Sequence, residues 1–334
     1  MITCEFHVPL SPTPAFANML FFLVQSIARN ARLPGRWKLI ATLSRDGDLT
    51  ADSPEFAWAK EFPVEFRAVD QALWDRFHAE SRERNWPTHE YSATALHALT
   101  YGYDSDAVIF MDADTIVTGP IGKIVRRAFE GDCLCAKPAY RLPSVDINKI
   151  LAMRGCVYDG PPVTFDGYGW EKNTPRHGPP YFNYGFIACS KRIAGLLASH
   201  LPAELEFVWT TRFSKLDWQI ALCIFIIKYG IPFRALPNKF NFGNGTYEAP
   251  TMEIPEAAEI HREMLANAAD IRVLHYCVPS EHFSRGTTMG DPAAIAHFCR
   301  MDGLTDGMAA LQRGLTPLLE PFRRHAAENL GLRL

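Results

Sequence analysis

Two carboxylates, Asp112 and Asp114, stand one residue apart directly after the apolar run from Val108 to Met111. Such a run is typical of a fully buried β-strand, which places both carboxylates at the carboxyl end of that strand. In an open α/β sheet, ligands bind beyond the carboxyl ends of the strands, and carboxylates this close can share a hard divalent cation. The spacing therefore predicts a metal site that faces a ligand cleft.

The elements that must position these carboxylates alternate between strand-like and helical patterns. Strand-like runs cover residues 2–8, 38–43, 64–69, 107–117 and 133–136. This alternation is typical of an α/β fold with a mostly parallel sheet. A first helix is predicted from Thr13, because Thr13 can cap it, Pro14 fits its first turn and apolar side chains recur on one face. We expect this helix to pack on the sheet.

Three later segments carry further polar residues. Residues 181–189 have a strand pattern, residues 217–230 predict a helix that is apolar on every face and ends at Gly230, and residues 271–277 predict another strand. A helix that is apolar all round lies in the core, so a polar residue in its first turn should be held at the edge of a site. The candidates on these segments are Gln219, in the first turn of that helix, and His275, toward the end of the last strand.

Residues 138–180 are interrupted repeatedly by Gly and Pro and predict a long loop within a single domain of residues 1–300. A long insertion in a compact enzyme usually either closes over a substrate or is partly disordered. Phe165, Tyr168 and Trp170 could contact an acceptor molecule there, and plain surface packing is the alternative.

Residues 301–334 predict an amphipathic helical extension, in which apolar side chains alternate with arginines such as Arg313 and Arg323. Docking of this extension on the domain is the preferred interpretation. Basic amphipathic helices can also lie on anionic lipid, so peripheral contact with the inner face of a membrane is the alternative.

The composition excludes several classes of protein. The chain has 334 residues, 48% hydrophobic and 21% charged, with a formal net charge of −3, which is typical of a globular protein with a substantial core. The weak net charge, with no basic run, disfavours nucleic-acid binding.

No apolar run reaches the roughly 18 residues of a membrane span, and the chain does not begin like a secretory signal, so we expect a cytoplasmic protein. The eight cysteines mostly lie in apolar runs, which predicts buried, reduced thiols.

The order of these motifs resembles the GT-A glycosyltransferases, and most closely family 8, which includes glycogenin and the bacterial lipopolysaccharide galactosyltransferases. The resemblance covers residues 2–275. It implies a Rossmann-like, mostly parallel sheet flanked by helices, and transfer of a hexose from a nucleotide-diphospho-sugar, a UDP-sugar, to a hydroxyl acceptor with retention of configuration. The motifs that carry it are Asp112-Ala113-Asp114, Phe182-Asn183-Tyr184-Gly185, Trp218-Gln219 and His275.

The resemblance implies that Asp112, Asp114 and His275 bind a divalent cation that bridges the donor's phosphates. Cleavage of the anomeric C–O bond releases a diphosphate, and a cation neutralises the charge that develops on it. Two carboxylates with an imidazole favour Mn²⁺, with Mg²⁺ as the alternative.

The resemblance also implies roles for residues around the cation. Asn183 to Gly185 would border the donor sugar, and Gln219 would reach its anomeric face. The nucleotide base and ribose would lie along Pro9, Leu10 and Ser11. The chain departs from the family's Asp-Gln-Asp motif, since Asp217 stands one position early. The family places Arg or Lys on the helix before the carboxylates, where this chain offers only His89 and His97. The family also often has Gly and Lys three and six residues after the histidine, where this chain has Val278 and Glu281.

Other classes stay open. The run Ile109 to Thr115 also fits the first motif of haloacid dehalogenase-like phosphatases, but about a hundred residues precede it, and Asp302 to Asp306 lacks the glycine of the later motif. A sugar nucleotidyltransferase should carry a Gly-rich loop after the first strand, and Val8 to Pro14 has no glycine. A catalytically degenerate domain that only binds a sugar nucleotide is the non-enzymatic alternative. The acceptor could be a glycan, a lipid-linked molecule, a protein or a small molecule.

Overall fold

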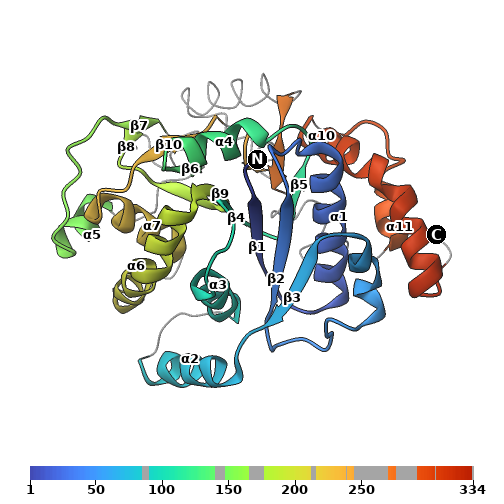
Figure 1. The fold of residues 1–334 in the computed structure, drawn as a ribbon, viewed down its shortest axis with the longest axis horizontal. Helices are drawn as coiled ribbons and strands as arrows, with labels where there is room; N and C mark the ends of the chain where they lie inside the picture. Colours follow the sequence, from blue (N-terminus) through green and yellow to red (C-terminus); the bar gives the residue numbers. More distant parts are fainter. Residues whose placement is uncertain are drawn as a thin grey trace.

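A computed structural model of the chain describes residues 1–84, 90–139, 147–164, 177–211, 216–237, 239–243, 270–275, 292–304 and 306–332. A seven-stranded sheet runs through its centre in the order β10-β6-β9-β4-β1-β2-β3 (Figure 1). Within this sheet β9 runs antiparallel to both of its neighbours, and the other pairs are parallel. The predicted α/β class and mostly parallel sheet are confirmed. The strands are β1 (Cys4–Leu10), β2 (Trp37–Leu43), β3 (Val64–Ala68), β4 (Ala107–Met111), β6 (Leu134–Pro138), β9 (Phe182–Ser190) and β10 (Phe233–Ala235).

Alternate side chains of the central strands enter two hydrophobic cores, one on each face of the sheet. In β4, Ile109 and Met111 belong to one core, and Val108 and Phe110 belong to the other. Figure 1 shows α1 on one side of the sheet and α6 and α7 on the other. The principal helices are α1 (Pro14–Asn30), α2 (Gln71–Glu83), α3 (Glu90–Thr100), α4 (Gly122–Glu130), α6 (Lys191–Thr210) and α7 (Asp217–Lys228).

The predicted strand 107–117 is two strands. β4 ends at Met111, and β5 (Thr115–Val117) belongs to a second sheet with β11 (Phe242–Gly243) and β12 (Val273–His275), in the order β11-β12-β5. The Thr115 hydroxyl donates a hydrogen bond to the Asp112 carbonyl oxygen at 2.7 Å, which closes a turn between β4 and β5. The two carboxylates therefore lie on a turn that joins two sheets.

Both predicted helices are confirmed. Thr13 occupies the N-cap position of α1 without a side-chain capping bond, and Pro14 follows in the first turn. In α7 the side chains from Ile220 to Ile226 are all buried. Gly230, which follows α7, has φ +59°, a left-handed conformation that glycine adopts readily.

The long-loop prediction for residues 138–180 is only partly right. This region contains a helix, α5 (Ile147–Met153), and a short antiparallel pair, β7 (Val163–Thr164) and β8 (His177–Gly178). Ile150 and Leu151 of α5 are buried in the core that also contains α6 and α7, which explains why a helix forms there. The proposed acceptor contacts Phe165, Tyr168 and Trp170 lie outside the described residues.

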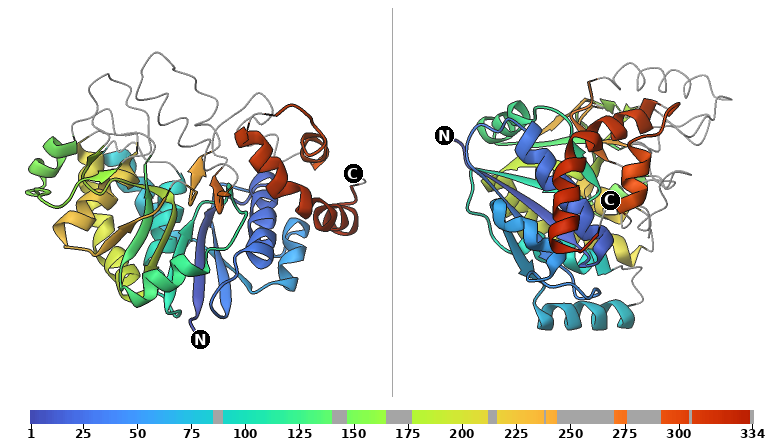
Figure 2. Two further views of the ribbon diagram at one scale, coloured as in Figure 1. Left: turned by 90° about the horizontal axis from the view of Figure 1, so that it is seen from above. Right: turned by 90° about the vertical axis from the view of Figure 1, so that its right-hand side faces the viewer.

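The C-terminal extension packs against α1, beside which it lies in both views of Figure 2. Phe322 is fully buried, and its ring lies 4.9 Å from the Phe22 ring and 5.3 Å from the Phe21 ring. The docking prediction is confirmed, and the apolar face that a membrane contact would need is used by this packing. The extension comprises α10 (Asp306–Leu315), η4 (Thr316–Leu318) and α11 (Leu319–Asn329), and α9 (Pro292–Phe298) precedes it.

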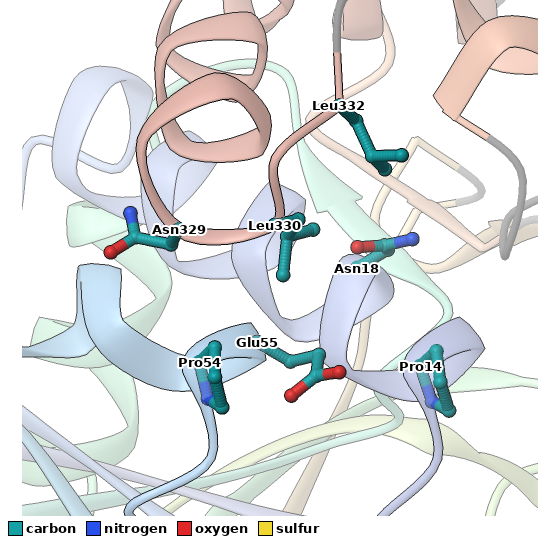
Figure 3. Close-up of a pocket in the computed structure, with 7 residues that line it drawn as sticks. All are labelled: Pro14, Asn18, Pro54, Glu55, Asn329, Leu330 and Leu332. Carbon is teal, nitrogen blue, oxygen red and sulfur yellow. The ribbon is translucent and has the colours of Figure 1, made fainter.

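An open cavity of about 380 Å³ lies where the end of the C-terminal extension meets α1 and η1 (Pro54–Glu61). Figure 3 shows the residues that line it: Pro14, Asn18, Pro54, Glu55, Asn329, Leu330 and Leu332.

Among the described helices, none combines the length and the apolar content that crossing a membrane requires. The seven cysteines in the described segments are free thiols, and all except Cys299 are buried. Burial, with a smaller contribution from the charge of Asp106, raises the pKa of the Cys4 thiol to about 12.

Candidate metal centre

Asp112, Asp114 and His275 meet at the carboxyl end of β4. Their potential ligand atoms all lie within 4.8 Å of one another. His275 Nε2 is 3.1 Å from Asp114 Oδ1 and 3.5 Å from Asp112 Oδ2. The carboxylate side chains are 24% and 25% exposed, and the imidazole is 7% exposed. Two hard oxygen ligands and one nitrogen ligand, open to solvent on the carboxylate side, fit a divalent cation.

The small sheet brings His275 to the carboxylates from far along the chain. β12 pairs antiparallel with β5, so that His275 lies opposite Thr115. Because Thr115 directly follows the turn that carries Asp112 and Asp114, this pairing places the imidazole beside both carboxylates. The backbone N–H of Asp112 also donates to the Gly185 carbonyl oxygen at 3.2 Å, which anchors the turn to β9.

Gly185 lies against two of the candidate ligands, His275 and Asp112. A Cβ added at Gly185 would be 2.3 Å from His275 Cε1 and 3.0 Å from Asp112 Oδ2. Real Cβ atoms do not approach other atoms at 2.3 Å, so the imidazole occupies the space that any side chain here would need. The strand must carry glycine at this position for the three ligands to come together.

Asn183 is connected to His275 through Asn241, a residue that the sequence analysis missed. Asn183 Oδ1 accepts hydrogen bonds from the Gly185 N–H at 2.8 Å and from Asn241 Nδ2 at 2.6 Å. Asn241 Oδ1 is 2.9 Å from His275 Nδ1. Asn241 is fully buried and has φ +66°, a left-handed conformation that Asn tolerates better than most residues. No motif spacing in the sequence points from Asn241 to His275.

Gln219 and Asp217 stand at the start of α7, which packs on β9 through the rings of Trp218 and Tyr184, 4.9 Å apart. Gln219 Oε1 is buried, and within the described residues it has no hydrogen-bond partner. The Asp217 carboxylate accepts hydrogen bonds from Trp209 Nε1 at 2.6 Å and from the Trp218 N–H at 2.9 Å. Asp217 therefore orders the first turn of α7, and a role for Gln219 at the donor sugar stays a prediction.

Pro9 and Leu10 end β1, the parallel neighbour of β4, so the loop that begins at Ser11 leaves the same edge of the sheet as the carboxylates. The Leu10 side chain is buried, and its carbonyl oxygen accepts a hydrogen bond from the Ser44 N–H. Ser11 is half-buried, and its hydroxyl donates to Asp46 Oδ2 at 3.2 Å. Of the three predicted nucleotide contacts, Ser11 offers a polar side chain.

The cluster of Asp112, Asp114 and His275 does not include His97. His97 lies in α3, where its ring is 5.3 Å from the ring of Tyr101. Burial is the main cause that lowers the pKa of His97, and the charges that also influence it are those of Asp70, Arg67 and Arg45. A role for His97 in donor binding stays a prediction.

The fold and site together define an α/β protein with a candidate cation site at the carboxyl edge of its sheet. No protein-family model matches the chain, and no curated protein sequence matches it. Among solved structures, the chain is similar to the bifunctional glycosyltransferase WbbM in its apo form, with 15% identity and a TM-score of 0.52 over 97% of this chain and 51% of that chain. This chain thus spans about half the length of the WbbM structure.

Two further solved structures are similar over most of the chain. The galactosyltransferase LgtC, in complex with donor and acceptor sugar analogues, has 14% identity and a TM-score of 0.49, over 85% of this chain and 90% of that chain. Mouse xyloside xylosyltransferase 1, apo form, has 14% identity and a TM-score of 0.48, over 82% and 97%. The similarity to WbbM shows that the chain has a glycosyltransferase fold, as the resemblance to the GT-A enzymes predicted.

Proposed function

We propose that this protein is a metal-dependent glycosyltransferase that moves a hexose from a UDP-sugar to a hydroxyl acceptor. The observation that carries the proposal is the cluster of Asp112, Asp114 and His275 at the carboxyl end of β4, within a glycosyltransferase fold. Ligands of open α/β sheets bind at this edge. A cation held there can neutralise a diphosphate leaving group.

Different residues in and around the cluster would bind the cation, the nucleotide and the sugar. The two carboxylates and His275 Nε2 would hold the cation, and the nitrogen ligand favours Mn²⁺ over Mg²⁺. The loop from Ser11, at the same sheet edge, would hold the nucleotide. Gln219 would present its amide to the sugar, because its buried Oε1 lacks a partner in the described structure. Asn183 supports the imidazole through Asn241.

Membership of family 8, the uracil base, the hexose and retention of configuration rest on the order of the sequence motifs. We propose a cytoplasmic enzyme whose acceptor is a glycan, a lipid-linked molecule, a protein or a small molecule. Residues 138–180 would contribute contacts to that acceptor. The phosphatase alternative loses support because the similar solved structures are glycosyltransferases and because Asp112 and Asp114 share their cluster with an imidazole.

Calorimetric titration with UDP, with and without Mn²⁺, tests the donor site. Wild-type protein should bind UDP in a Mn²⁺-dependent manner, and Asp114→Ala should abolish that dependence while the protein stays folded. Asp75→Ala is the matched control, because Asp75 is an exposed carboxylate in α2. Mn²⁺-independent binding, or unchanged binding in Asp114→Ala, would overturn the metal assignment.

Release of free sugar from a panel of UDP-sugars, in the presence of Mn²⁺ and without acceptor, then separates an enzyme from a degenerate binding domain. A glycosyltransferase should hydrolyse its own donor slowly. A protein that binds UDP but releases no sugar from any donor, with or without acceptor candidates, would be a binding domain.

A further inference from the structure

Asn241 reaches the proposed cation site although it is not one of the candidate ligands. It precedes β11, the strand that pairs with β12, and its side chain lies between Asn183 and His275. It is fully buried, so its amide must form its hydrogen bonds inside the protein.

Three hydrogen bonds connect Gly185, Asn183, Asn241 and His275 in series. The direction of each of them follows from the backbone N–H of Gly185. The Gly185 N–H can only donate, so the atom of Asn183 that faces it, 2.8 Å away, must be the oxygen. That same oxygen faces Asn241 at 2.6 Å, so Asn241 must turn its NH₂ group toward Asn183. The Asn241 oxygen is then the atom that faces His275.

This direction decides which nitrogen of His275 carries a proton. Asn241 Oδ1 can only accept, so His275 Nδ1, 2.9 Å away, must donate. The neutral imidazole then has its lone pair on Nε2, the nitrogen that lies 3.1 Å from Asp114 Oδ1 and 3.5 Å from Asp112 Oδ2. A lone pair directed at two carboxylates requires a cation or a proton between them.

We propose that Asn241 is a positioning residue that holds His275 in the Nδ1–H tautomer and so presents Nε2 to the cation. The inference rests on the proposed function, because the cation site is the one described there. Groups that hold a metal-binding histidine by its other ring nitrogen typically contribute about 10- to 100-fold to metal affinity.

Two substitutions separate this role from a role in the backbone turn. Asn241→Gly removes the amide but accommodates φ +66° without strain. Asn241→Asp keeps an oxygen that can accept from His275 Nδ1 but puts a second oxygen against Asn183. If Asn241 acts on the tautomer, Asn241→Gly should weaken Mn²⁺ binding about 10- to 100-fold, and Asn241→Asp should retain it within a few-fold. If Asn241 serves only the turn, Asn241→Gly should bind Mn²⁺ as wild type does, because glycine adopts φ +66° without strain.

The decisive readout needs no cation. Nitrogen NMR of ¹⁵N-histidine-labelled protein, at an alkaline pH where the imidazole is neutral, reports the tautomer directly, and His275→Asn assigns the signals. Wild type and Asn241→Asp should show Nδ1–H, whereas Asn241→Gly should shift toward Nε2–H. An Nε2–H signal in wild type, or no change in Asn241→Gly, would overturn the proposal. If wild type fails to bind Mn²⁺, the proposed function fails, but the NMR result still decides the role of Asn241.

Discussion

The imidazole of His275 lies directly on the backbone of Gly185, so close that a Cβ on Gly185 would be 2.3 Å from His275 Cε1. This contact joins β9 of the large sheet to β12 of the small sheet. Both strands also contact the turn that carries Asp112, one through a backbone hydrogen bond and the other through pairing with β5. The geometry of the candidate cation site therefore depends on how closely the two sheets approach.

Gly185→Ala should displace the imidazole and weaken Mn²⁺ binding by at least about tenfold, since the added methyl group takes the space of the ring. Binding is measured by calorimetry, and thermal unfolding reports whether the fold survives. Gly195→Ala is the matched control, because a Cβ at Gly195 meets no atom within 4 Å. If Gly185→Ala binds Mn²⁺ as wild type does, the ring position is not needed for the site.

Gln219→Ala should lower kcat by at least about tenfold and change KM for the donor much less, if the amide acts mainly in the transition state. The buried, unpartnered Oε1 motivates this expectation for the described structure. The measurement is steady-state kinetics with the donor found in the sugar-release screen, and Gln71→Ala, an exposed amide in α2, is the control. A change in KM alone would assign Gln219 to donor binding instead of the chemical step.

The turn that carries the carboxylates can be tested through Thr115. Its hydroxyl donates to the Asp112 carbonyl oxygen at 2.7 Å, so Thr115→Val should cost about 1 kcal/mol of stability. It should also weaken Mn²⁺ binding, because the turn loses the bond that closes it. Both effects are measured on one preparation, by urea unfolding and by calorimetry.

Thr118→Val is the matched control for Thr115. The Thr118 hydroxyl donates to the Ile271 carbonyl oxygen at 2.8 Å, just beyond the other end of β5. This variant should lose a similar stability of about 1 kcal/mol and bind Mn²⁺ normally. Equal loss of Mn²⁺ binding in both variants would mean that the whole small sheet, and not the turn, controls the site.

The elements and the pair of candidate carboxylate ligands that the sequence predicted are those set by local patterns. The period of the apolar residues predicts α1 and α7, and the carboxylate pair lies at the end of a predicted buried strand. The apolar run through Ile116 and Val117 hid the break between β4 and β5, because a single side-chain hydrogen bond from Thr115 closes that turn. The helix α5 was missed because the glycines and prolines around it obscure a short buried face.

The contact between Asn241 and His275 could not have been predicted from either segment alone. It depends on a left-handed residue before a two-residue strand and on pairing between strands that are distant in the sequence. His275 itself was found only through the order of the motifs. Sequence patterns indicate which residues could bind a cation, whereas their support comes from long-range packing.

The last prediction concerns Glu204, a fully buried carboxylate in α6 that joins three helices. It accepts hydrogen bonds from Arg154 Nε at 2.6 Å, Lys228 Nζ at 2.7 Å and the Tyr229 hydroxyl at 3.0 Å. Burial acts to raise the pKa of Glu204, but the hydrogen bonds from these three partners outweigh it and hold the pKa below its ordinary value. The ionised carboxylate therefore stabilises the folded state.

Because the folded pKa lies below the unfolded one, this stabilisation is complete above the unfolded pKa of about 4.3 and is lost as the pH falls through the folded pKa. Glu204→Gln should lower the free energy of unfolding by about 3 kcal/mol at neutral pH, the lower end for a broken buried ion pair. The difference from wild type should shrink below pH of about 4. Urea unfolding across this pH range measures it.

Glu206→Gln, on the same helix, is the control for this series. Glu206 is 52% exposed and lies 3.9 Å from Arg84, so its removal should change stability by less than about 1 kcal/mol at any pH. The difference in unfolding free energy between Glu204→Gln and wild type could instead stay constant as the pH falls. That result would show that the shape and hydrogen bonding of Glu204, rather than its charge, hold α6 to α7 and to the end of α5.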